Sequence, residues 1–150
     1  MYKPFNLSIA AVALLLSVAA APAQELNSSW RLRVLDMDHQ PKAQATVQFS
    51  DEAVRFCMRG KWRRLIIDRV EGSEPAFFPL EQAVVYKLEH GVLNMASASR
   101  CNPYSLLSAV SASEDIHGSY QVVSTGRSSK RGLFSMNPLP VPRPAAPAPP

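Results

Sequence analysis

The stretch WRLRVLDMDHQPKAQATVQFS, residues 30–50, contains two alternating segments separated by a turn-forming sequence. In WRLRVL, residues 30–35, apolar residues alternate with arginines, and in ATVQFS, residues 45–50, they alternate with polar residues. A period of two is typical of a β-strand that buries one face. The intervening DMDHQPKA, residues 36–43, has the Asp, His and Pro content of a turn. The stretch therefore predicts two neighbouring strands, each with one apolar face.

Similar β-rich segments, bounded by Gly, Pro or polar residues, continue along the chain. We expect further strands at residues 53–58, 62–70, 83–90, 92–98, 104–112, 116–124 and 132–137, with loops at 71–82 and 125–131. Residues 79–88 are the best helix candidate and remain a minority interpretation. About eight antiparallel strands with one buried face predict an all-β fold, either an up-and-down barrel or a strongly curled sheet, because closure removes exposed edges.

The two ends of the chain differ in composition from its middle. Residues 1–23 contain a positively charged start, an apolar run and a final APA, which is the pattern of a secretory signal peptide cleaved before Gln24. The run is shorter than the roughly 20 apolar residues of a membrane-spanning helix, so we expect no membrane span. Residues 138–150 contain seven prolines and predict a disordered proline-rich tail. A β-barrel domain is left at residues 24–137, in a periplasmic or secreted bacterial protein.

The net charge is mildly positive. The formal value is +4, of which Lys3 in the predicted signal peptide contributes one. A modest excess of basic residues supports attraction to anionic surfaces but does not by itself indicate nucleic-acid binding. Because an exported protein rarely meets nucleic acid, we expect no such partner.

Cys57 and Cys101 are the two cysteines of the chain. An even number in an exported protein favours a disulfide, and a closed loop of about 45 residues stabilises a fold by roughly 4 kcal/mol. Alternatively, Cys57 is the nucleophile of a thiol enzyme, activated by the basic residues around it. Such an enzyme needs a general base, and none of His39, His90 and His117 lies in a recognisable catalytic motif. We expect the disulfide, no enzymatic activity and no cofactor.

A basic cluster surrounds Cys57. Its residues are Arg55, Arg59, Lys61, Trp62, Arg63 and Arg64, with Arg69 further along the chain. If residues 53–58 form a strand with Val54, Phe56 and Met58 facing the barrel interior, then Cys57 and Arg55 face outward. Guanidinium groups bind carboxylates and phosphates in a bidentate geometry. The cluster is therefore our candidate site for an envelope or secreted protein partner or an anionic glycolipid, and a solvated strand face is the simpler alternative.

Two further features of the sequence each have more than one interpretation. Phe77 and Phe78 lie in a proline-bounded loop and are candidates for a lid over the barrel mouth or an anchor for a partner, with a plug on the core as the other option. The segment DMDH, residues 36–39, offers oxygen and nitrogen ligands for a metal. A polar hairpin turn explains the same residues, and we expect no metal site there.

The order of these segments resembles that of small exported lipocalin-like barrels, namely bacterial META-domain proteins and periplasmic alkaline-protease inhibitors. The resemblance rests on Trp30 with Leu32, on VQFSDEAVRF at 47–56, on Gly118 with Tyr120 and on RGLFSM at 131–136, and covers most of residues 28–137. It implies architecture and assigns no functional residue.

The sequence favours an exported, non-enzymatic binding protein, most simply a periplasmic protein-binding or inhibitor-type barrel. One alternative is a carrier of a small apolar ligand, since an eight-stranded barrel has room for side chains or one small ligand. The other is the thiol enzyme using Cys57.

Overall fold

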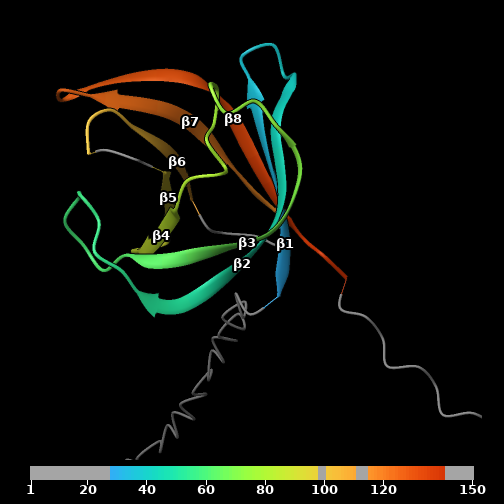
Figure 1. The fold of residues 1–150 in the computed structure, drawn as a ribbon, viewed down its shortest axis with the longest axis horizontal. Helices are drawn as coiled ribbons and strands as arrows, with labels where there is room; N and C mark the ends of the chain where they lie inside the picture. The colour runs from blue at the N-terminus through green and yellow to red at the C-terminus, as the bar shows by residue number, and fades with distance from the viewer. Residues whose placement is uncertain (1–27, 98–100, 111–114, 141–150) are drawn as a thin grey trace, which may run out of the picture.

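The computed structural model of the protein describes residues 28–97, 101–110 and 115–140. These residues form eight β-strands and contain no helix (Figure 1). The strands are β1 (Ser29–Asp36), β2 (Pro41–Ala53), β3 (Arg63–Ser73), β4 (Val84–Glu89), β5 (Val92–Ser97), β6 (Tyr104–Val110), β7 (Ile116–Ser124) and β8 (Arg127–Pro138). The predicted signal peptide and residues 141–150 of the predicted tail lie outside the described residues.

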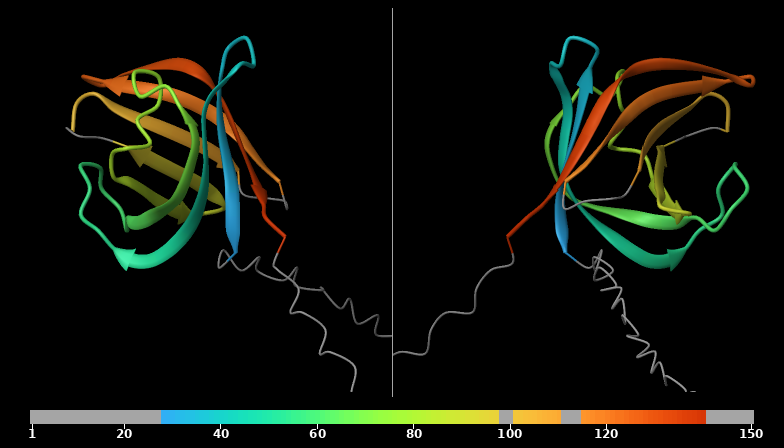
Figure 2. Two further views of the ribbon diagram at one scale, coloured as in Figure 1. Left: turned by 45° about the vertical axis from the view of Figure 1, so that its right-hand side comes forward. Right: turned by 180° about the vertical axis from the view of Figure 1, so that it is seen from behind.

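The strands close into an up-and-down barrel. Each strand is antiparallel to the next, and β8 pairs with β1 to complete the ring (Figures 1 and 2). The first hairpin shows the register that the alternation predicts, because Trp30 pairs with Val47 and Leu32 pairs with Ala45, all four being buried. The predicted all-β fold and its barrel closure are confirmed.

The barrel interior is filled by the protein's own side chains. Aromatic rings pack edge to face along it, with Phe49 at 6.1 Å from Trp30 and at 4.8 Å from Tyr86 between ring centroids. Phe78, from the loop between β3 and β4, is fully buried in the same core and contacts Tyr120. The side chains of this core are between 0% and 9% exposed. Such packing is typical of a structural core rather than of a ligand chamber.

The prediction of a strand at residues 53–58 is wrong. β2 ends at Ala53, and residues 54–62 form a loop, here called the flap, that lies on the outer wall of the barrel. Val54, Phe56 and Met58 do share one face, but that face packs against a second apolar cluster outside the barrel. The buried members of this cluster are Trp62, Val85 and Ala96, and Leu106 is partly buried beside them. The alternation in this segment therefore reflects an outer contact and not the interior.

Two other predicted boundaries change. The loop expected at residues 125–131 is reduced to a tight turn at Thr125 and Gly126, both with positive φ, because β7 and β8 continue as a paired hairpin. The residues of this hairpin end are exposed, so no apolar alternation indicated strands there. The helix candidate at residues 79–88 is also wrong, since these residues are divided between the β3–β4 loop and β4.

Candidate functional site

A disulfide joins the flap to the loop that precedes β6. Cys57 and Cys101 are bonded, with their Cα atoms 5.3 Å apart. The predicted disulfide is therefore confirmed. Both sulfurs are used in this bond, so Cys57 has no thiol to serve as a nucleophile in this state.

Trp62 is the apolar anchor of the flap. Its side chain is 2% exposed, and its indole Nε1–H donates to the backbone oxygens of Met58 at 3.0 Å and Arg59 at 3.3 Å. Phe56 packs against it at 4.9 Å between ring centroids and also contacts Tyr104 of β6 at 6.4 Å. The flap is thus held by one covalent bond, by an aromatic cluster and by its own hydrogen bonds.

The barrel wall under the flap carries an ion pair. Lys87 Nζ lies 3.2 Å from Glu89 Oε2 and 5.1 Å from the centre of the Trp62 ring. The hydrogen bond from Lys87 is the main reason that the pKa of Glu89 is lowered, and the backbone N–H of Lys61 on the flap acts in the same direction. A cation over a tryptophan face adds a favourable contact. Lys87 and Glu89 therefore contact the flap from the barrel wall and help to fix its orientation.

The structure divides the basic cluster into two parts. Arg63 pairs with Asp51 at 2.8 Å, and Arg64 pairs with Glu52 at 3.1 Å, so both charges are locally compensated. The other three side chains, Arg55, Arg59 and Lys61, all belong to the flap and are exposed. They form no ion pair with any residue that the structure describes.

The candidate site therefore contains fewer residues than the sequence indicated. Trp62, which we considered as a binding residue, faces the barrel wall and positions the loop instead. Arg69 is exposed on β3, in register with Thr46, and belongs to a different part of the wall. What remains is a loop, fixed by a disulfide, that presents three cations to solvent, none of which forms an ion pair within the described residues.

The two phenylalanines of the β3–β4 loop have different environments. Phe78 is fully buried and plugs the core. Phe77 is half-buried, contacts Tyr120 at 5.2 Å between ring centroids and lines a pocket at the barrel mouth. Arg131 lines the same pocket, and sequence reasoning did not single it out. No local pattern could have revealed it, because its position depends on how β7 and β8 pair.

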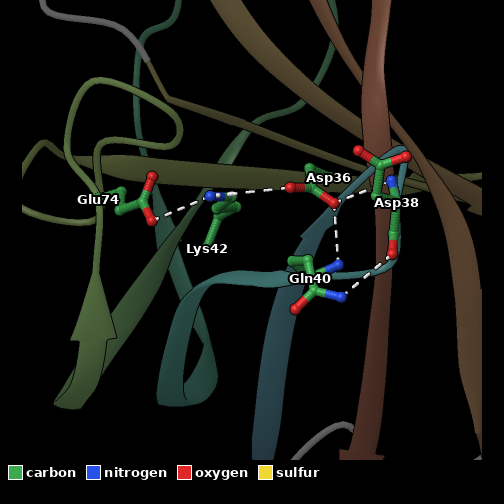
Figure 3. A network of polar contacts seen from close by, with 5 residues as sticks. All are labelled: Asp36, Asp38, Gln40, Lys42 and Glu74. Atoms are coloured by element: carbon green, nitrogen blue, oxygen red, sulfur yellow. Dashed lines mark hydrogen bonds and ion pairs between the residues drawn. The ribbon is translucent and has the colours of Figure 1, made fainter.

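The DMDH segment forms the turn between β1 and β2. Asp36 Oδ1 accepts hydrogen bonds from the backbone N–H groups of Asp38 and Gln40, both at 2.9 Å (Figure 3). Lys42 Nζ lies 3.7 Å from Asp36 Oδ2 and 3.1 Å from Glu74 Oε1, and its hydrogen bond to Glu74 raises its pKa. A turn therefore accounts for these residues. Within the described ranges, no group of three or more His, Cys, Asp or Glu side chains is arranged to hold a metal.

Comparison with known proteins finds no matching protein family, no matching curated protein and no matching solved structure. In the part of the chain that the structure describes, no helix has the length and apolar character needed to cross a membrane.

Proposed function

We propose that the protein is an exported, non-enzymatic binding protein whose flap engages an acidic surface of a partner protein in the envelope or outside the cell. The observation that carries this proposal is a set of three cations on a loop held by a disulfide, with no ion-pair partner in the part of the chain that the structure describes. Arg55, Arg59 and Lys61 project from nine residues that are fixed at Cys57 and at Trp62.

A fixed loop suits protein recognition for a physical reason. Binding costs free energy when side chains and loops become ordered, and a loop that is already ordered avoids much of that cost. The guanidinium groups of Arg55 and Arg59 offer bidentate hydrogen bonds to carboxylates. Positive charge at the rim of an interface also increases the association rate with an acidic partner. An inhibitor-type or accessory role is consistent with these properties.

The two alternative functions have less support. A carrier needs an internal chamber, and the core side chains that fill the barrel are at most 9% exposed. A thiol enzyme needs a free Cys57, which is bonded to Cys101. The disulfide supports an oxidising compartment, and we include export in the proposal on that ground and on the pattern of residues 1–23.

The test is a capture experiment with matched variants. The disulfide-bonded protein is immobilised, and an envelope extract is passed over it at low and at physiological salt. We expect the triple variant Arg55→Gln, Arg59→Gln, Lys61→Gln to lose the captured partner. The control Arg33→Gln, Arg69→Gln, Lys130→Gln removes the same charge from other exposed positions and should retain it.

Equal retention by both triple variants would overturn the proposal, since binding would then not depend on the flap. A parallel measurement uses vesicles with and without an anionic glycolipid. If the wild-type protein binds only the glycolipid vesicles, and the flap variant does not, the partner is a lipid surface and the protein-binding proposal is wrong.

A further inference from the structure

A pocket of about 370 Å³ opens where the β3–β4 loop, residues 74–83, meets β6, β7 and β8. Figure 2 shows this loop reaching across the barrel toward β7 and β8. We call it the mouth pocket. Its lining includes the apolar residues Phe77, Pro79 and Val122. Its size lies near the lower end of the roughly 300–1,000 Å³ of small-molecule sites.

Tyr120 forms a fixed polar floor. Its hydroxyl donates to the backbone oxygen of Phe77 and lies 3.3 Å from Ser105 Oγ. Burial raises the pKa of Tyr120, while the hydrogen bond with Ser105 and the positive charge of Arg131 act in the opposite direction. Arg131 and Tyr120 line the same pocket. The phenol is neutral at physiological pH, because its pKa lies above the ordinary tyrosine value.

A β-bulge brings Arg131 to this place. Tyr120 pairs with Gly132, and Gln121 pairs with Lys130, so Arg131 is the additional residue between two pairs. Bulges bend a strand locally and redirect a side chain. Arg131 lines the mouth pocket, whereas Lys130, its neighbour in sequence, does not.

Two side chains at the pocket, Arg131 and Gln82, have donor groups without a partner within the described residues. The Arg131 guanidinium forms no ion pair there, and the side-chain amide of Gln82 makes no hydrogen bond there. An unpaired guanidinium beside an apolar wall matches a ligand with a carboxylate at one end and a flat apolar body at the other. Phe77 lines the pocket and is half-buried, so it offers an aromatic surface for such a body.

We propose that the mouth pocket binds a small aromatic carboxylate. Arg131 binds the carboxylate with Gln82 as a second donor, and Phe77, Pro79 and Val122 hold the ring. The carboxylate belongs to a free aromatic acid or to the end of a peptide with an aromatic last residue. The mouth pocket contains none of the three cations of the flap. Ligand binding at the pocket can therefore be tested independently of the proposed function.

The experiment titrates the folded, disulfide-bonded protein with naphthoate and with naphthamide, its neutral analogue, by calorimetry and by NMR chemical shifts. We expect naphthoate to bind about tenfold or more tightly than naphthamide, because a charge-assisted bidentate pair is among the stronger polar contacts. Arg131→Gln should remove this preference, because naphthoate binding weakens more than naphthamide binding. Lys130→Gln removes the same charge one residue away and should keep the preference.

Arg131→Lys, which keeps the charge without the planar guanidinium, should give an intermediate preference and serves if the glutamine variant fails to fold. A tripeptide ending in phenylalanine is titrated for comparison with naphthoate. Tighter binding of the tripeptide would identify a peptide end as the source of the carboxylate, and tighter binding of naphthoate would identify a free aromatic acid. Three results would overturn the proposal. They are no binding of either carboxylate, equal binding of naphthoate and naphthamide, and an equal effect of Lys130→Gln and Arg131→Gln.

Discussion

Gly132 shows how a single residue permits closure of the barrel. It pairs with Asp36 where β8 meets β1, and a Cβ atom at this position would lie 1.8 Å from the backbone oxygen of Leu35. Real Cβ contacts are never that short. The absence of a side chain therefore allows the last strand to approach the first, directly beside the bulge at Arg131.

We predict that Gly132→Ala destabilises the protein by about 3 kcal/mol, because the added methyl group forces apart two backbones that cannot yield like a flexible side chain. The measurement is urea unfolding. Gly72→Ala is the matched control, since nothing lies within 4 Å of its added Cβ and its φ is ordinary. A similar loss in both variants would mean that the close approach at Gly132 is not responsible.

Tyr120 gives a prediction about pH. Burial raises the pKa of the Tyr120 phenol in the folded state. The stability that the neutral phenol contributes is therefore fully present below the ordinary tyrosine pKa of about 10, and it is lost as the pH rises through the folded-state pKa. We expect Tyr120→Phe to remove a phenolate absorbance step above that ordinary value. Persistence of the step in the variant would assign it to another tyrosine.

Some residues could be interpreted from sequence and others could not. The Cys57–Cys101 bond followed from an even cysteine count in a chain with a secretory pattern, which is information present in the sequence itself. The division of the basic cluster did not follow from the sequence. Arg63 and Arg64 form ion pairs with Asp51 and Glu52 because β2 and β3, which the flap connects, pair with each other. The position of Arg131 depends on a bulge, which has no signature in an exposed polar hairpin.

At the level of elements, the flap explains the main error of the sequence analysis. Alternation predicted a strand at residues 53–58, and the alternating face exists. However, apolar periodicity indicates only that one face is buried and not which surface covers it. Here the cover is the outside of β4, β5 and β6, where Val85, Ala96 and Leu106 continue the apolar surface. The inward residues of the same strands, among them Val84, Leu93 and Leu107, belong to the interior core.

We predict that reducing the Cys57–Cys101 bond releases the flap and leaves the barrel intact. The two cysteines are 44 residues apart, and loss of a cross-link of this span destabilises a fold by about 4 kcal/mol through loop-closure entropy. The barrel core contains no flap residue, so its circular dichroism should persist under native conditions. Trypsin should then cleave at Arg55, Arg59 or Lys61.

The control for this prediction is the same protein digested without reductant, in which the flap should resist trypsin at the same enzyme ratio. The double variant Cys57→Ser, Cys101→Ser should behave like the reduced protein. If the reduced flap remained resistant, the cluster around Trp62 alone would be sufficient to hold it, and the disulfide would have another role.

At the level of the whole molecule, the ring of strands is not uniform. β1 and β8 pair along seven residues, whereas β3 and β4 pair only at Arg63–Leu65 with Val84–Tyr86. Beyond this point β3 continues to Ser73 and pairs with β2 alone. The β3–β4 loop fills the opening with Phe78. The sequence predicted closure but could not locate this weak seam, because both strands are equally rich in β-forming residues.

We predict that local opening begins at the seam between β3 and β4. Amide hydrogen exchange should be faster in the β3–β4 ladder, at residues 63–65 and 84–86, than in the β1–β8 ladder, at residues 30–36 and 132–138. Short ladders with solvent-exposed continuations open at lower free energy. Uniform exchange around the ring would show instead that the barrel opens as one cooperative unit.

The order of the strands has a last consequence, because every strand neighbours the next and the last neighbours the first. Leu139 donates its backbone N–H to the oxygen of Ser29, so the chain leaves the barrel beside the point where it entered. A short linker could join these two points, and new termini could be introduced at the exposed turn of His90 and Gly91. Such a circular permutant should assemble the same ring, since the connectivity favours no particular starting strand.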